Sequence, residues 1–163
     1  MNAADDPVVE VLLVEDLDED AELTIRALKR CKSITSILRL PDGEKALDYL
    51  LGRGEYAARN TMNYPRMILL DLKLPKVDGI DILKAISTKV EFRHIPVVVM
   101  TSSRETKDIA RAYEFGANSY VVKPVDFSVF SDVASKLGEY WMSINEGSPK
   151  IAVQSPLSRS VGG

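Results

Sequence analysis

The chain has 163 residues, of which 45% are hydrophobic, enough for one domain with a full core and too few for two. Its formal net charge of -3 argues against nucleic acid as the main partner, because phosphate backbones bind to basic surfaces. The sequence has no membrane-length apolar run, and its acidic N-terminus is unlike a secretory signal. A single cysteine, Cys31, excludes an internal disulfide framework. These features predict a cytoplasmic protein that binds neither nucleic acid nor membrane.

Strand-like and helix-like segments alternate along the chain. Short apolar runs rich in β-branched residues predict buried strands, and apolar residues spaced by three and four predict amphipathic helices between them. The predicted strands are 8–14, 36–40, 67–70, 95–100 and 119–122, and the predicted helices are 18–30, 44–51, 80–88, 104–115 and 127–144. A loop over residues 52–65 is longer than most connections.

Five such strand–helix units predict an α/β fold built on one parallel sheet. Continuous apolar strands indicate a sheet covered by helices on both faces, and right-handed crossovers favour a doubly wound arrangement. We expect one domain over residues 8–144, preceded by an N-terminal extension (1–7). Residues 145–163 contain prolines and serines with little apolar content, which predicts a disordered tail.

Polar residues with chemical potential stand at the carboxyl ends of the predicted strands. In an open parallel sheet these ends meet at one edge, where ligands bind. Four segments distant in sequence are therefore predicted to form one pocket. They are Glu15-Asp16 after the first strand, Asp71 after the third, Thr101 after the fourth and Lys123-Pro124 after the fifth.

These residue types together suit phosphoryl chemistry. Three carboxylates in one pocket repel one another, and a hard cation such as Mg²⁺, which binds oxygen ligands, relieves that repulsion. Glu15, Asp16 and Asp71 are the candidate ligands. Asp71 could also attack phosphorus as a nucleophile and form an acyl phosphate. The Lys123 ammonium and the Thr101 hydroxyl would then serve the other phosphoryl oxygens.

Each residue has a simpler explanation when it is taken alone. An acidic pair after a strand often caps a helix or lies on the surface, and a lone aspartate is often a turn residue. Residues 101–103 (Thr-Ser-Ser) could cap the helix that follows them, and Lys123 could be a surface residue. The four segments in this order on five strand–helix units favour the functional interpretation.

The motif set resembles the receiver domain of two-component response regulators. The similarity covers residues 8–144 and is carried by Glu15-Asp16, Asp71 to Pro75 (DLKLP), Asp78-Gly79, Thr101-Ser102 and Lys123-Pro124. The resemblance implies a flavodoxin-like (βα)5 three-layer sandwich with strand order 2-1-3-4-5. It also implies that a histidine kinase phosphorylates Asp71. The protein would be a phosphoacceptor switch that assists its own phosphorylation and dephosphorylation, and no enzyme in the usual sense.

The resemblance further implies a role for each site residue. Mg²⁺ would be bound by Asp16, Asp71 and the backbone carbonyl of Lys73, with Glu15 acting mostly through a metal-bound water. Lys123, Thr101 and Ser102 would surround the phosphoryl group. Tyr120, three residues before Lys123, would form a switch pair with Thr101, and the Lys123-Pro124 peptide bond is expected to be cis.

The long loop and the tailed layout look like stand-alone regulators that serve phytochrome-type kinases. Signalling is expected on the face formed by the fourth helix, the fifth strand and the last helix, where Tyr140 is a candidate contact for a partner or a homodimer. Two residues depart from the common family pattern. Glu15 replaces an aspartate, and Lys73 places a cation beside the site, where it could pair with Glu15. We expect a lysine lying across the phosphoryl group to slow its hydrolysis; the alternative is that a mobile lysine draws charge off the phosphoryl group and speeds hydrolysis.

Three alternative classes of function are weaker. The run after the third strand lacks the second aspartate of the Asp-x-Asp phosphatases, and no Gly-rich phosphate loop of a nucleotide switch occurs. A degenerate receiver that only binds partners is disfavoured by the intact acid, threonine and lysine set. His94, just before a strand, and Cys31, predicted to be half-buried on a helix, are expected to be structural.

Overall fold

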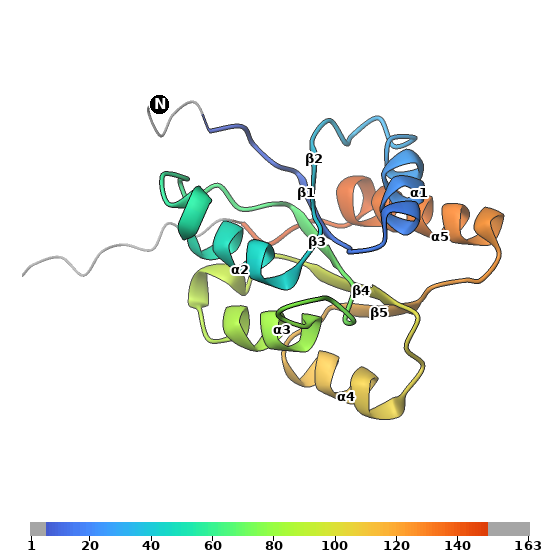
Figure 1. The fold of residues 1–163 in the computed structure, drawn as a ribbon. Coiled ribbons are helices and arrows are strands. Elements are labelled where there is room, and N and C mark those ends of the chain that lie inside the picture. The colour runs from blue at the N-terminus through green and yellow to red at the C-terminus, as the bar shows by residue number, and fades with distance from the viewer. Residues whose placement is uncertain (1–5, 150–163) are drawn as a thin grey trace, which may run out of the picture.

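The computed structural model describes residues 6–149, which form one α/β fold (Figure 1). Five parallel strands make a single sheet in the order β2-β1-β3-β4-β5, which confirms the predicted fold class and strand order. Residues 1–5 and most of the predicted tail, 150–163, lie outside the described residues. The strands are β1 (Val11–Val14), β2 (Ile37–Leu40), β3 (Met67–Leu70), β4 (Val97–Thr101) and β5 (Ser119–Val122). The α-helices are α1 (Asp18–Leu28), α2 (Gly43–Leu51), α3 (Gly79–Ser87), α4 (Thr106–Glu114) and α5 (Phe127–Glu139).

Helices cover both faces of the sheet, as Figure 1 shows, with α1 and α5 on one face and α2, α3 and α4 on the other. Side chains of each strand alternate between these two layers, because successive residues of a strand point to opposite faces. On β1, Leu12 and Val14 join the core beneath α2 and α3, whereas Val11 and Leu13 join the core beneath α1 and α5. Burial on both faces explains why the strand is continuously apolar.

Aspartate side chains fix where three of the helices begin. Asp42 accepts a hydrogen bond from the Lys45 backbone N–H at the start of α2, and Asp78 accepts one from the Asp81 N–H at the start of α3. Asp126 does the same at the start of α5. Each bond satisfies an N–H group that the helix itself leaves free. The loops at the carboxyl edge of the sheet therefore end at defined residues.

Three helices, α1, α4 and α5, differ from their predicted extents by two or more residues at one end, and α1 ends at Leu28. The α4 helix begins at Thr106, because Glu105 has an extended backbone conformation. The last helix is α-helical only to Glu139 and continues as a π-helical turn, η4 (Tyr140–Ile144). The Arg66 guanidinium donates to the Met142 carbonyl at 2.9 Å, and the Met142 side chain is buried in the core. The apolar spacing that predicted one continuous helix persists through this turn, so the sequence did not reveal the change.

The long loop after α2 is packed against its own helix. It contains a short 3₁₀ turn, η2 (Gly54–Tyr56), and the Arg59 guanidinium lies 4.1 Å from the centre of the Tyr49 ring. Arg59 also donates to the Tyr49 carbonyl at 2.8 Å. These cation–π and hydrogen-bond contacts hold the loop on the side of the molecule away from the carboxyl edge of β3.

Close backbone contacts hold the loops at the carboxyl edge of the sheet together. A Cβ atom on Gly79 would lie 2.4 Å from the Asp71 carbonyl oxygen, and one on Gly43 would lie 1.7 Å from the Val77 carbonyl oxygen. Neither distance is possible for a real side chain. The glycines thus allow the starts of α2 and α3 to pack directly on the loop that follows β3, which carries Asp71.

Candidate functional site

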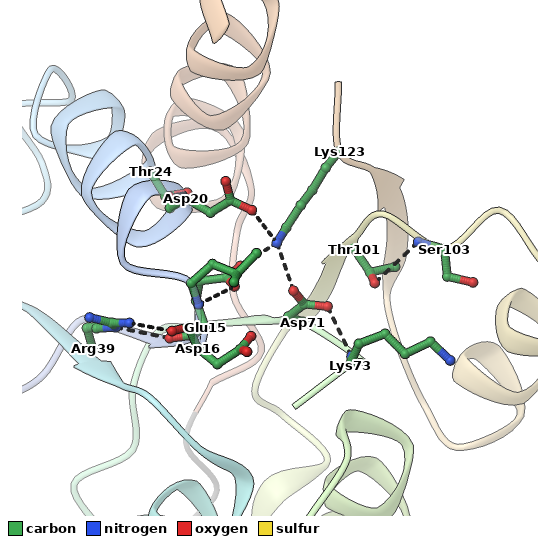
Figure 2. Close-up of polar contacts among 11 residues, drawn as sticks. Glu15, Asp16, Asp20, Thr24, Arg39, Asp71, Lys73, Thr101, Ser103 and Lys123 are labelled. Atoms are coloured by element: carbon green, nitrogen blue, oxygen red, sulfur yellow. Dashed lines mark hydrogen bonds and ion pairs between the residues drawn. The ribbon is translucent and has the colours of Figure 1, made fainter. Parts of the chain in front are cut away.

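Three acidic residues meet at the carboxyl edge of the sheet (Figure 2). Glu15 follows β1 and Asp71 follows β3, and both are buried, with 3% and 5% of their surface exposed. Asp16 is half-buried. Carboxylate oxygens of the three residues lie within 4.8 Å of one another. The structure therefore brings the three candidate metal ligands together, and their all-oxygen donor set fits a hard divalent cation such as Mg²⁺.

A single buried ammonium group joins the acidic cluster. Lys123 follows β5, and its Nζ lies 2.6 Å from Glu15 Oε2, 2.8 Å from Asp20 Oδ2 and 2.7 Å from Asp71 Oδ2. Burial alone would lower the pKa of Lys123, but the hydrogen bonds to Asp20, Asp71 and Glu15 outweigh burial and raise the pKa above its usual value. Lys123 is therefore charged, and the pocket holds a positive group where a phosphoryl oxygen would need one.

The pocket also changes the ionisation of Glu15. Burial raises its pKa to about 7, the Lys123 hydrogen bond opposes this effect, and the nearby Asp71 charge adds to it. The other carboxylate oxygen, Oε1, accepts a hydrogen bond from the Leu17 backbone N–H at 3.1 Å. A cation bound beside Glu15 would favour its charged form.

Arg39 on β2 holds the loop that carries the acidic pair. Its guanidinium donates to the carbonyl oxygens of Glu15 (3.0 Å) and Asp16 (3.1 Å) and forms an ion pair with Asp18 Oδ1 at 2.7 Å. One planar group thus fixes three positions of the β1–α1 loop. Arg39 and Asp20 were missed at the level of sequence. A usable signal for Asp20 was its place in the acidic first turn of the helix that follows the Glu15-Asp16 pair, whereas nothing in the sequence marked Arg39.

Thr101, Ser102 and Tyr120 lie on the other side of the pocket. Thr101 is the last residue of β4 and is fully buried, while Ser102 is exposed. Figure 2 shows Thr101 across Asp71 from the acidic pair. Tyr120 on β5 is half-buried, and its hydroxyl donates to the Ser103 carbonyl oxygen at 2.9 Å. The predicted switch residues thus lie on neighbouring strands beside the acidic cluster.

Lys73 lies where predicted, but its side chain has a different partner. Its backbone N–H donates to Asp71 Oδ1 at 3.1 Å, and its Nζ lies 3.3 Å from Asp108 Oδ2 on α4. Figure 2 shows the side chain directed away from the acidic pair. The predicted pairing of Lys73 with Glu15 is wrong, because Lys123 already binds Glu15 and Asp108 offers Lys73 a carboxylate at the opposite rim.

The predicted cis peptide bond between Lys123 and Pro124 is also wrong. No peptide bond within residues 6–149 is cis. The trans form is the preferred one for a bond to proline, and with it the Lys123 ammonium already reaches three carboxylates.

Two other residues singled out in the sequence lie away from the pocket. Cys31 is half-buried as predicted but lies beyond the end of α1, with Sγ 3.6 Å from Ser143 Oγ. The helix predicted over 18–30 is shorter because its α-helical bonding ends at Leu28. His94 is exposed before β4, and its Nδ1 lies 2.9 Å from Ser148 Oγ.

The parallel sheet and this acid–lysine pocket define a phosphoacceptor class of α/β protein, and comparison with known proteins gives its family. The model of the response regulator receiver domain matches residues 11–134. The chain belongs to the response regulator receiver domain family. Receiver domains are phosphoacceptor switches that work with histidine kinases and bind Mg²⁺ or Mn²⁺ at an acidic pocket.

Similar proteins cover almost the whole chain. The probable methanogenesis regulatory protein FilR2 of Methanothrix harundinacea is 43% identical over 143 residues, which are 87% of this chain and 88% of that protein. Response regulator Rcp1 of Synechocystis is 32% identical over 142 residues, covering 87% of this chain and 95% of Rcp1. The crystal structure of its Mn²⁺-bound form superimposes with a TM-score of 0.80 and covers 88% of this chain and 100% of that one.

A third similar structure is that of the phosphorylated cyanobacterial phytochrome response regulator RcpA. It is 32% identical, has a TM-score of 0.80 and covers 88% of this chain and 100% of its own. The fold is thus shared with a receiver that has been observed in its phosphorylated form. Within residues 6–149, no helix combines the length and apolar character needed to cross a membrane.

Proposed function

We propose that Asp71 accepts a phosphoryl group from a histidine kinase and that the protein signals through the resulting change. The observation that carries this proposal is how Asp71 is held. Its buried carboxylate accepts a bond from Lys123 Nζ at one oxygen (2.7 Å) and from the Lys73 backbone N–H at the other (3.1 Å). The nucleophile is therefore oriented before any substrate arrives, at the carboxyl edge of β3.

Glu15, Asp16, Asp71 and the backbone carbonyl of Lys73 would hold Mg²⁺. When bound, the cation would supply charge neutralisation to the carboxylates and to the phosphoryl oxygens. The clustering of the three carboxylates within 4.8 Å supports these assignments. Glu15, whose carboxylate is engaged by Lys123 and by the Leu17 N–H, would take part mostly through a bridging water.

The transfer exchanges one bond to phosphorus for another. A carboxylate oxygen of Asp71 attacks the phosphorus of a phosphohistidine, the P–N bond breaks, and the leaving imidazole takes up a proton. Lys123, already charged, would exchange part of its carboxylate contacts for a phosphoryl oxygen. The hydroxyl groups of Thr101 and Ser102 would bind a further oxygen. The same pocket would assist hydrolysis of the acyl phosphate, in which a water in the place of the imidazole attacks the phosphorus, the P–O bond to Asp71 breaks and inorganic phosphate leaves.

Thr101 and Tyr120 would carry the signal outward. When Thr101 turns toward the phosphoryl group, Tyr120 would turn inward and leave the Ser103 carbonyl, which it now binds at 2.9 Å. The face formed by α4, β5 and α5 would change, and it would bind a partner or a second copy of the chain. Tyr113 and Tyr140, with 50% and 47% exposure, are candidate contacts there.

The protein would act in the cytoplasm as a receiver domain spanning residues 8–144. A phytochrome-type histidine kinase is the proposed partner, because this chain is similar to Rcp1 and RcpA along almost their whole length and RcpA is a cyanobacterial phytochrome response regulator. The choice of kinase is tested by measuring the rate of phosphoryl transfer to this protein from phytochrome-type kinases and comparing it with the rate from unrelated histidine kinases. A faster rate from unrelated kinases would contradict it.

The function itself is tested with a small phosphodonor and Mg²⁺, followed by mass spectrometry of the intact chain. We expect one base-labile phosphoryl group on the native protein and none on Asp71→Asn. The matched control is Asp81→Asn, since Asp81 is exposed on α3 and is not part of the cluster formed by Glu15, Asp16 and Asp71. Full labelling of Asp71→Asn would refute the assignment of Asp71.

A further inference from the structure

An ion pair links the phosphoacceptor loop to helix α4. Lys73 Nζ lies 3.3 Å from Asp108 Oδ2, and the two side chains differ in exposure, 63% for Lys73 and 8% for Asp108. The Lys73 backbone is fixed next to the acceptor by its N–H bond to Asp71. Rotation of the Lys73 side chain alone would therefore move its ammonium group from the observed position to one above the Asp71 carboxylate.

The contacts of Asp108 favour its charged form. Ser103 Oγ donates a hydrogen bond to Asp108 Oδ2 at 2.5 Å, and this bond holds the pKa of Asp108 below its usual range, with a further contribution from Lys73. Ser103 also accepts the Tyr120 hydroxyl through its carbonyl oxygen. Asp108 thus lies between the lysine beside the acceptor and the residue that binds the proposed switch tyrosine.

We infer that Asp108 is a positioning residue for hydrolysis of the phosphoryl group, because it holds the Lys73 ammonium on the α4 rim and keeps it off the path of the attacking water. This inference rests on the proposed phosphorylation of Asp71. A phosphoryl group on Asp71 attracts the lysine, and Asp108 competes for it. When Asp108 is replaced by a neutral residue, the Lys73 side chain rotates to lie above the phosphoryl group and shields it from water. The phosphoryl group then persists longer.

A purely structural role for Asp108 makes a different prediction. Acidic residues in the first turn of a helix stabilise it, and Asp108 lies in the first turn of α4. If that were its whole contribution, replacing Asp108 would alter the phosphoryl lifetime by the same factor whether or not Lys73 is present. A double-mutant cycle separates the two roles.

The experiment measures the rate of phosphoryl loss at saturating Mg²⁺ for the native protein, Asp108→Asn, Lys73→Met and the double variant. We expect Asp108→Asn to lengthen the lifetime about twofold to fivefold, the modest range of a partly exposed ion pair. In the Lys73→Met background the same change should have no effect. An equal factor in both backgrounds, or no change in either, would overturn the inference. Thermal unfolding of each variant checks that the fold is retained.

A second measurement tests the anchor without phosphorylation. Acylation of lysine side chains by a small reagent, mapped by mass spectrometry, reports how freely each ammonium moves. We expect Asp108→Asn to raise the reactivity of Lys73 relative to Lys45, an exposed lysine on α2. Unchanged reactivity would overturn the anchor. If the native protein takes no phosphoryl group at all, the proposed function fails, and this measurement still decides whether Asp108 holds Lys73.

Discussion

At the scale of single residues, the pocket depends on a few charged groups with several partners each. Lys123 binds three carboxylates with one ammonium, and Arg39 binds two carbonyls and a carboxylate with one guanidinium. A buried charge is tolerated when such bonds replace the lost water. Removing either group leaves several polar atoms without a partner at once.

Lys123→Met should destabilise the metal-free protein by about 3–5 kcal/mol, the cost of leaving buried charges unpaired. Mg²⁺ should still bind, because the lysine is no ligand, and should recover part of the lost stability. Urea unfolding with and without Mg²⁺ measures both effects. Wild-type-like activation of this variant by phosphorylation would contradict the proposed role of the ammonium.

Arg39→Met should weaken Mg²⁺ binding about tenfold, as changes around metal ligands commonly do, because the β1–α1 loop loses its clamp. The matched control is Arg26→Met, whose guanidinium forms an exposed ion pair with Glu22 on the same helix, α1. Calorimetric titration with Mg²⁺ gives the two affinities. Equal losses in both variants would show that the loop does not need Arg39.

At the scale of elements, the starts of α2 and α3 pack directly on the loop that carries the acceptor residue. The α3 helix begins at Gly79, which packs directly on the backbone of Asp71 and Leu72. The Gly79 backbone N–H donates a hydrogen bond to the Leu72 carbonyl oxygen at 2.9 Å. The position of the acceptor carboxylate therefore depends on the absence of a side chain at the first residue of the helix.

Gly79→Ala should lower stability by about 1–3 kcal/mol, since a Cβ there forces the backbone apart. It should also slow phosphorylation by displacing Asp71. Gly147→Ala is the control, because a Cβ at Gly147 would meet no atom of residues 6–149 within 4 Å. Unfolding midpoints and labelling rates of the two variants test this, and an unchanged rate in Gly79→Ala would show that the acceptor loop adapts.

At the scale of the whole molecule, stability is linked to pH through the buried acid. The pKa of Glu15 rises from about 4.5 to about 7 on burial, so between these values the folded state holds a proton that the unfolded state has lost. The contribution of Glu15 to stability should therefore fall as pH increases from about 4.5 to about 7, and remain constant above that range.

Glu15→Gln cannot ionise and should lack this dependence. In metal-free urea unfolding at pH 5 and pH 7.5, the free energy of unfolding of the variant relative to the native protein should shift in favour of the variant at the higher pH. A difference that is independent of pH would show that Lys123 keeps Glu15 charged throughout.

The sequence by itself determined the parallel sheet covered on both faces and the candidate pocket, whereas the strand order was implied by the resemblance to receiver domains. The strands are apolar on both faces because helices cover both, so their runs are visible without any structure. Glu15, Asp71 and Lys123 are recognisable because they stand directly after such runs, and the parallel sheet brings the ends of its strands to one edge. The boundaries of α4 and the π-helical turn were not predictable, since they depend on backbone bonding that leaves the apolar spacing unchanged.

Only the tertiary structure decided which charge binds which. Arg39 reaches the acidic loop because β2 lies beside β1, and Lys73 binds Asp108 because α4 returns to the loop after β3. The sequence suggested Glu15 as the partner of Lys73, but Lys123 pairs with Glu15 and Lys73 pairs with Asp108. Long flexible side chains have many possible partners within reach, and the fold selects among them by distance, burial and competition.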